Sequence, residues 1–157
     1  MQRETTLKKR GRIIKIVVDA SIIVKWFIQE KDSDKAKLIR EKYIDGDIEL
    51  IAPSLMYFEV LNALKYSELF ESSELNDAAE SLEKYGFTII TIKNNLRKNM
   101  IKIAVDHKLS IYDASYLALS LGLGKIFCTA DEKIIKKLPA TLKSKVKRLK
   151  YFEEIFR

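Results

Sequence analysis

Hydrophobic positions along this chain follow two alternating patterns, one typical of buried strands and one typical of helices. Short runs rich in β-branched residues predict strands, at residues 13–18, 48–52, 87–92, 125–128 and 146–149. Apolar residues three or four positions apart predict helices between them, at residues 21–27, 36–44, 54–70, 72–85, 95–107 and 110–122. Two more short helices are expected, one after Thr129 and one at the carboxyl end. Strands that alternate with helices predict an α/β fold with a mostly parallel sheet.

Four acidic residues are notable because each lies beside or within an apolar segment. Asp19 directly follows the first predicted strand, and Asp131 follows the predicted strand that contains Cys128. Glu59 and Asp113 are each the only charged residue in a long apolar stretch that includes a predicted helix. An isolated carboxylate is costly to bury unless it is protonated, paired or bound to a cation. Ligands of parallel sheets bind beyond the carboxyl ends of the strands, so we expect the four acids to meet there around a shared ligand.

Most of these acids also have a purely structural explanation. Asp19 and Asp131 can cap the helices that follow them, and Asp113 can complete a capping box at the start of its helix. Capping explains each of these three as well as a functional role does. Glu59 is different, because Asn62 is its only polar neighbour on the helix, and a functional role explains it better.

Composition predicts one folded domain. The chain has 157 residues, of which 47% are hydrophobic, and can therefore bury a sizeable core. We expect residues 13–157 to form this domain and the polar, basic residues 1–12 to form an arm outside it. Cys128 has no second cysteine to pair with and lies in a predicted core strand, which fits a reducing cytoplasm. No apolar run is long enough to span a membrane, so we expect a soluble, cytoplasmic protein with no membrane partner.

Positive charge is concentrated toward the two ends of the chain. The formal net charge is +7, and residues 1–12 carry five basic residues against one acid. Residues 133–150 carry eight basic residues and no acid, whereas the segment between these two is acidic overall. An acidic body between basic ends fits a cation-dependent protein that binds a polyanion. A solvated basic tail explains the same charges equally well.

The acids also indicate which kind of ligand they can share. Carboxylate oxygens are the ligands that Mg²⁺ and Mn²⁺ prefer. Such an ion polarises a phosphodiester and activates a water molecule, so that no Ser, Cys or His nucleophile is needed. His107 is the only histidine, and its place at a helix end favours a capping role. One His and one Cys cannot complete a closed zinc site, so the sequence favours a hard divalent cation.

The four acids lie within the motifs VVDAS at 17–21, FEVLNAL at 58–64, IYDASYLA at 111–118 and TAD at 129–131. This ordered set resembles the successive motifs of PIN-domain ribonucleases, and most of all those of the VapC toxins of prokaryotic toxin–antitoxin pairs. The resemblance spans residues 13–138. It implies a three-layer α/β/α sandwich around a mostly parallel central sheet. It also implies Mg²⁺- or Mn²⁺-dependent cleavage of phosphodiester bonds in single-stranded RNA.

The resemblance assigns expected roles to individual side chains. Asp19, Asp113 and Asp131 correspond to metal ligands, and Glu59 corresponds to an acid that binds a second ion or orients the attacking water. The expected supporting residues are Ser21, Asn62 and Thr129. Family members are commonly homodimers and are inhibited by a cognate antitoxin protein that inserts residues into the acidic groove. Both partners are therefore expected here, besides the RNA substrate.

Other functions explain parts of the same sequence. A housekeeping RNA-processing nuclease would use the same acids, and a noncatalytic RNA-binding or assembly subunit would keep them without activity. A phosphoaspartate enzyme would also place an Asp after its first strand, but the residues next to Asp19 include no second acid. Trp26, Tyr112 and Tyr116 either offer stacking surfaces for RNA bases or pack in the core.

Overall fold

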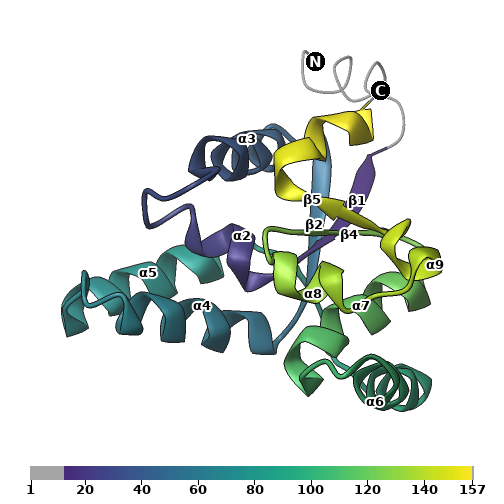
Figure 1. Cartoon of the computed structure of the whole chain (residues 1–157). Coiled ribbons are helices and arrows are strands. Elements are labelled where there is room, and N and C mark those ends of the chain that lie inside the picture. Colours follow the sequence, from purple (N-terminus) through teal and green to yellow (C-terminus); the bar gives the residue numbers. More distant parts are fainter. Residues whose placement is uncertain (1–12, 157) are drawn as a thin grey trace.

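The computed structural model describes residues 13–156, so the predicted basic arm lies outside the described residues. Within them, five strands form one sheet in the order β3-β2-β1-β4-β5 (Figure 1). The strands are β1 (Ile14–Val18), β2 (Ile48–Pro53), β3 (Thr88–Ile90), β4 (Ile126–Thr129) and β5 (Val146–Arg148). Every neighbouring pair is parallel, which confirms the sheet that the alternating pattern predicts.

Helices cover both faces of the sheet and make a three-layer α/β/α arrangement (Figure 1). The α-helices are α2 (Ala20–Val24), α3 (Ser33–Ile44), α4 (Leu55–Tyr66), α5 (Ser72–Lys84), α6 (Asn95–His107), α7 (Ile111–Leu123), α8 (Glu132–Lys136) and α9 (Ala140–Lys143). A 3₁₀ segment, η1 (Leu149–Phe156), ends the described chain. Helix α7 packs on β1, β2 and β4 and is backed by α6, while α3 and η1 cover the other face.

The strand order creates a switch point at the carboxyl ends of β1 and β4. From β1 the chain moves outward through β2 to β3, and it then returns to the other side of β1 as β4. The connections on the two sides of β1 therefore leave in opposite directions, between the carboxyl ends of β1 and β4. Ligands of parallel α/β proteins bind at switch points of this kind.

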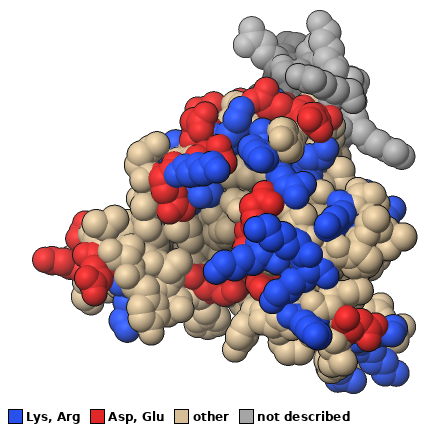
Figure 2. Space-filling view, viewed as in Figure 1, with Lys and Arg blue, Asp and Glu red and all other residues tan. Residues whose placement is uncertain are grey.

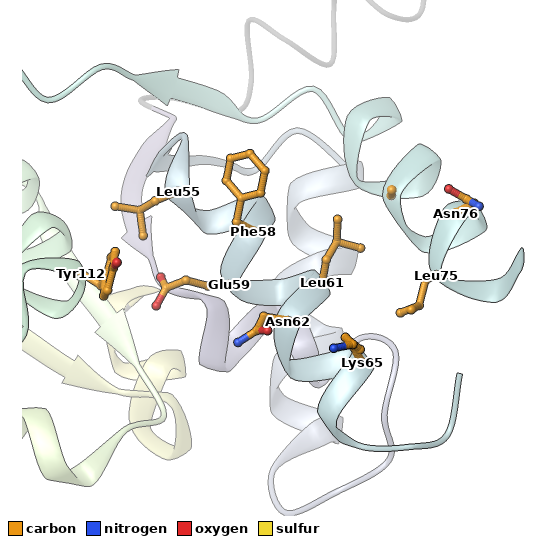
Figure 3. Close-up of a pocket in the computed structure, with 10 residues that line it drawn as sticks. Leu55, Phe58, Glu59, Leu61, Asn62, Lys65, Leu75, Asn76 and Tyr112 are labelled. Carbon is orange, nitrogen blue, oxygen red and sulfur yellow. The ribbon is translucent and has the colours of Figure 1, made fainter. Parts of the chain in front are cut away.

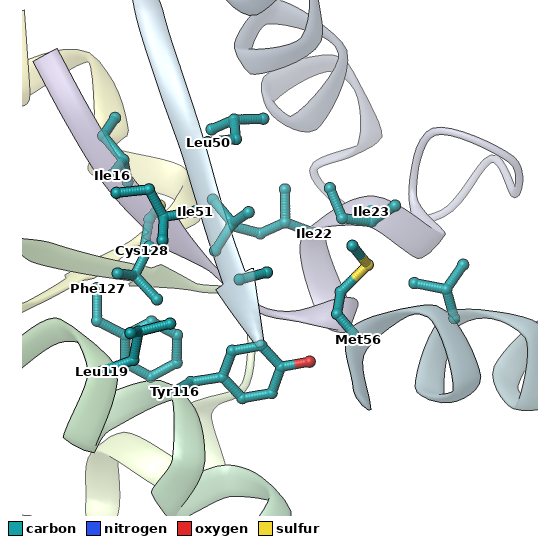
Figure 4. Close-up of a cluster of buried hydrophobic side chains, with 14 of the residues drawn as sticks. Ile16, Ile22, Ile23, Leu50, Ile51, Met56, Tyr116, Leu119, Phe127 and Cys128 are labelled. Carbon is teal, nitrogen blue, oxygen red and sulfur yellow. The ribbon is translucent and has the colours of Figure 1, made fainter. Parts of the chain in front are cut away.

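The main core lies between the sheet and the helices around this switch point (Figure 4). Its largest fully buried side chains come from strands and from both helix layers: Ile16, Ile22, Ile23, Ile39, Leu50, Met56, Leu64, Leu82, Tyr116, Leu117, Phe127 and Phe152. Because β1 is covered on both faces, its last three residues are almost completely buried. This burial fixes the end of β1, and with it the residue that follows.

The structure differs from the predicted elements in one boundary, one additional helix and one helix type. Helix α4 ends at Tyr66 and not near Phe70, because the Ser67 hydroxyl bonds the Leu64 carbonyl and Glu68 then takes a left-handed φ of 61°. Helix α9 was not predicted. The expected carboxyl-terminal helix is of the tighter 3₁₀ type.

Two side chains with open sequence interpretations belong to the core. Trp26 is buried, and its Nε1 donates to the Ala36 carbonyl at 2.8 Å, so its role is packing and not stacking on bases. Cys128 is fully buried in β4, and burial raises the pKa of its thiol, which keeps it neutral. Between residues 13 and 156 we find no helix that is both long and apolar enough to span a membrane.

Candidate active site

Asp19 occupies the end of β1 at the switch point and is only 4% exposed. Its Oδ1 accepts hydrogen bonds from the Ser21 backbone N–H at 3.1 Å and from the Ser21 hydroxyl at 2.5 Å. Its Oδ2 accepts a hydrogen bond from the Thr129 hydroxyl at 2.5 Å. Asp19 is therefore the N-cap of α2, as one sequence interpretation predicted, and also the centre of a buried polar network.

The hydroxyl network ties the ends of β1 and β4 together. Val18 lies opposite Cys128 in the parallel register, so the next residues along, Asp19 and Thr129, are brought side by side. The Ser21 hydroxyl accepts from the Ala130 N–H at 3.0 Å, and the Thr129 hydroxyl accepts from the Asp131 N–H at 3.0 Å. Each hydroxyl thus donates to Asp19 and accepts from the strand end, which orients the carboxylate.

Glu59 lies on α4 and is held by a tyrosine of α7. The Tyr116 hydroxyl donates to Glu59 Oε1 at 2.6 Å, and the Tyr116 side chain is almost fully buried. Its ring stacks on Phe127 of β4, so the hydroxyl is carried on a rigid support. Sequence reasoning missed this role and considered Tyr116 only as packing or as a base-stacking surface. The signal available in the sequence was that Tyr116 lies three residues after Asp113, on the same side of the predicted helix.

Glu59 also borders a groove of about 800 Å³ that runs along α4 (Figure 3). Phe58 is 76% exposed in this groove and Tyr112 is 60% exposed. The Glu59 carboxylate points toward Tyr112, and Asn62 lies one turn further along α4 (Figure 3). Glu59 is half-buried. Among the described residues no hydrogen bond joins Asn62 to Glu59.

Asp113 and Asp131 lie in the first turn of α7 and at the N-cap of α8. The Asp113 N–H donates to the Ser110 hydroxyl at 3.0 Å, which is the half of the predicted capping box that starts the helix. Asp131 Oδ1 accepts from the Lys133 N–H at 2.9 Å. Asp131 therefore caps α8 with its own carboxylate as predicted, whereas the cap of α7 is the Ser110 hydroxyl. Both carboxylates remain partly accessible.

The four acids influence one another electrostatically. Burial raises the pKa of Asp19 to about 7, despite the hydrogen bonds from Ser21 and Thr129 that lower it, and the charges of Asp131 and Glu59 add to the rise. Burial likewise raises the pKa of Glu59, with a further contribution from Asp113.

The pKa of Asp113 is also raised, by burial and by Asp131, while Lys137 opposes the rise. Together these interactions link all four predicted acids into one cluster whose negative charge favours a cation.

The donor set of this cluster fits a hard divalent cation, since it consists of carboxylate and hydroxyl oxygens. No three Asp, Glu, His or Cys side chains between residues 13 and 156 are arranged closely enough to coordinate one ion. The hydroxyl groups of Ser21 and Thr129 instead engage both oxygens of Asp19. The arrangement is an acidic cluster around the switch point and not a preformed coordination sphere.

Basic side chains gather beside the acids. Figure 2 shows Lys and Arg side chains over α8, with Asp and Glu side chains along the border of this basic area. Lys137, which directly follows α8, interacts with Asp113, and its Nζ donates to the Lys108 carbonyl at 3.1 Å. The cluster therefore adjoins a surface that attracts polyanions.

A five-stranded parallel sheet in this order, with acids gathered at its switch point, defines a PIN-like α/β protein. Residues 16–139 match the PIN domain family, and the chain belongs to this family. It is 30% identical over 132 residues to ribonuclease VapC3 of Pyrobaculum aerophilum, which covers 81% of this chain and 97% of that protein.

Solved structures show the same fold. A toxin–antitoxin complex from Klebsiella pneumoniae aligns with a TM-score of 0.62 at 18% identity, covering 85% of this chain and 97% of that chain. The Mycobacterium tuberculosis toxin VapC20, described as cleaving the sarcin–ricin loop, aligns with a TM-score of 0.59 at 15% identity, covering 76% and 92%. At these identities the likeness supports the three-layer fold and not a particular substrate.

Proposed function

We propose that this protein is a divalent-metal-dependent endoribonuclease that hydrolyses single-stranded RNA. The observation that carries the proposal is the buried carboxylate of Asp19 at the switch point, in electrostatic contact with Glu59 and Asp131. A cluster of acids that raise one another's pKa gains stability when a cation neutralises it. The ribonuclease relative at 30% identity supports the same chemistry.

In this proposal Asp19, Asp113 and Asp131 would hold Mg²⁺ or Mn²⁺. When bound, the ion supplies Lewis-acid polarisation of the scissile phosphodiester and lowers the pKa of water. Glu59 takes a proton from the attacking water, which its raised pKa favours. The water oxygen forms the new bond to phosphorus, the bond to the leaving ribose oxygen breaks, and that oxygen takes a proton from solvent.

The supporting side chains keep these acids in position. Ser21 and Thr129 orient Asp19 through their hydroxyl groups, and Tyr116 orients Glu59. Asn62 lines the same groove as Glu59 and can contact the RNA. The exposed ring of Tyr112 at the end of this groove offers a stacking surface for an unpaired base.

Cleavage assays on the purified protein test this function. We expect the wild type to cleave a single-stranded RNA with Mg²⁺ or Mn²⁺ and to lose activity in EDTA. Asp19→Asn and Asp113→Asn should each lower the cleavage rate by more than the roughly 10- to 100-fold cost of changing a residue that supports a metal ligand. Asn keeps the N-cap that Asp19 provides, so the fold should persist.

Asp106→Asn is the matched control. Asp106 lies on the exposed face of α6, where it pairs with Lys102 at 2.8 Å, so its loss should leave the cleavage rate unchanged. Full activity in Asp19→Asn or Asp113→Asn would refute the site. If the wild type binds RNA but cleaves none with any divalent metal ion, the protein is better explained as a noncatalytic RNA-binding subunit.

We also propose that the protein is the toxin of a type II pair and is bound by a cognate antitoxin. One structural relative was solved as a toxin–antitoxin complex, which supports this partnership. A small protein encoded beside this chain should co-purify with it and suppress cleavage when the two are co-expressed. Growth arrest on expression of the wild type, relieved by Asp19→Asn, would support a toxin over a housekeeping nuclease. Light scattering tests the expected homodimer.

A further inference from the structure

A second, smaller pocket of about 150 Å³ lies at the carboxyl ends of β4 and β5. Thr129 and Arg148, which are paired in the register of these two strands, both line it. Thr129 is also the residue that donates to Asp19. The pocket is therefore the next position along the same sheet edge, beyond the acidic cluster on the side away from β2.

The charge of this pocket is opposite to that of the acidic cluster. Four lining residues are cations and two are acids, namely Lys25, Lys31, Arg148 and Lys150 against Asp32 and Glu132. Positive side chains thus face the pocket from the turn between α2 and α3 and from the end of β5. In Figure 2 the basic area on this face adjoins acidic side chains.

Several of these cations have N–H groups that are available to bind a ligand. The Nε of Arg148 donates to both carboxylate oxygens of Glu132, at 2.9 and 3.1 Å, which orients the guanidinium group. Its two Nη groups make no hydrogen bond among residues 13–156. Over the same range Lys31 and Lys150 form no ion pair, whereas Lys25 pairs with Glu30 at 3.1 Å.

The size of the pocket limits what it can bind. Pockets that enclose whole small-molecule ligands measure roughly 300–1,000 Å³, so about 150 Å³ is too little for a complete nucleotide. It is sufficient for a phosphate group. An oriented guanidinium beside lysines is the donor set that recognises phosphate oxygens.

We propose that this pocket binds a backbone phosphate of the RNA substrate next to the scissile one. The inference rests on the proposed ribonuclease function and extends it. In this proposal the scissile phosphate lies over Asp19 at the end of β1 and Glu59 on α4, and the RNA strand continues across the end of β4 to Arg148 and Lys150. The RNA backbone then runs along the carboxyl edge of the sheet from β1 toward β5.

Lys150→Gln tests the subsite with little risk to the fold, because the side chain is exposed. Loss of one exposed phosphate contact should raise the KM for RNA about threefold to tenfold and change kcat little. The slope of log Kd against log salt should fall by about 0.7, the value for one phosphate of a single strand. Arg148→Lys, which keeps the charge and loses the fork, should give a smaller rise in KM.

Lys145→Gln is the matched control. Lys145 is exposed and directly precedes β5, so it lies at the amino end of this strand, whereas Lys150 lies beyond the carboxyl end. The Lys145→Gln substitution removes the same charge from the protein and should leave KM and the salt slope unchanged. Equal effects of Lys145→Gln and Lys150→Gln would show only a general charge effect and would overturn the subsite.

Neutral methylphosphonate groups, placed one at a time along the RNA, locate the contact. In the wild type one position beside the cleaved bond should raise KM, and Lys150→Gln should show no further loss at that position. If every position affects both proteins by the same factor, the subsite is refuted. If an acidic peptide competes with the RNA for this pocket, and RNA binding depends on no single phosphate, the pocket belongs to a protein partner. That result would also refute the phosphate subsite.

The two proposals fail in different ways. A wild type that cleaves no RNA in any divalent metal refutes the proposed function. A wild type that cleaves RNA while Lys150→Gln leaves both KM and the salt slope unchanged refutes the phosphate subsite alone. Circular dichroism and thermal melting of each variant confirm that its fold is intact.

Discussion

Replacing Asp19 with Asn should stabilise the metal-free protein at neutral and alkaline pH while it abolishes activity. The pKa of Asp19 rises from 3.8 in the unfolded chain to about 7 in the folded state, chiefly through burial. A raised carboxyl pKa means that the folded state binds a proton more tightly than the unfolded state does. The free energy of unfolding of the wild type therefore falls as pH rises from about 4 to about 7, and then levels off.

The magnitude follows from the size of the pKa rise. Each pKa unit corresponds to about 1.4 kcal/mol, so a rise of roughly three units gives an upper limit of about 4 kcal/mol. Asn at position 19 does not titrate and still caps α2, so it avoids this cost above pH 7 and gains nothing at pH 4. For a protein of this size, 1 kcal/mol shifts Tm by about 2–4 °C, so Tm at pH 8 should rise by as much as about 16 °C.

Thermal melts of wild type and Asp19→Asn in EDTA, from pH 4 to pH 9, measure this difference. The Tm gap between the two proteins should open between pH 4 and pH 7 and stay constant above. Saturating Mg²⁺ should raise the Tm of the wild type at pH 8 and close the gap, because the ion neutralises Asp19. A Tm gap that does not change with pH would refute the idea that Asp19 is buried as a costly charge.

Three further changes test the parts around Asp19. Tyr116→Phe removes the hydrogen-bond donor to Glu59 and should lower the cleavage rate about tenfold. The acid limb of the pH–rate profile should also move to higher pH, because the charged form of Glu59 loses a hydrogen bond and its pKa rises. Thr129→Val removes a donor to Asp19 and should lower the free energy of unfolding at pH 8 by about 1–3 kcal/mol, measured by urea titration. Phe152→Ala, in the buried part of η1, should cost about 3–5 kcal/mol in one cooperative transition if the described chain unfolds as a single domain.

Each of these changes has its own control. Tyr112→Phe removes an exposed tyrosine hydroxyl at the end of the groove and should leave the pH–rate profile in place. Thr129→Ser keeps the hydroxyl and should recover most of the stability that Thr129→Val loses. Tyr151→Ala changes an exposed aromatic residue of η1 and should cost far less than Phe152→Ala. Equal effects within any of these pairs would contradict the corresponding contact.

Local sequence signals were sufficient for most of the fold. Strands rich in β-branched residues and helices with apolar periodicity alternate along the chain, and a parallel sheet follows from that alternation. The limits of the elements were less predictable. The end of α4 depends on the Ser67 hydroxyl and on the left-handed Glu68, and the carboxyl-terminal segment is a 3₁₀ helix that packs against β4, β5 and α3.

The sequence by itself determined which acids to examine, because Asp19, Glu59, Asp113 and Asp131 each border or interrupt an apolar segment and occur in recognisable motifs. Only the tertiary structure decided what holds them. The order of the strands, which is set by long-range packing, places Thr129 beside Asp19 although 110 positions separate them. The fold likewise brings the Tyr116 hydroxyl of α7 to Glu59 of α4, 57 positions away in the sequence.

The basic pocket beside Thr129 also depends on the tertiary structure, since its cations come from the turn after α2 and from the end of β5. Local sequence patterns report burial and periodicity within one element. Contacts between distant elements depend on which faces pack together, and that is decided only when the whole chain folds.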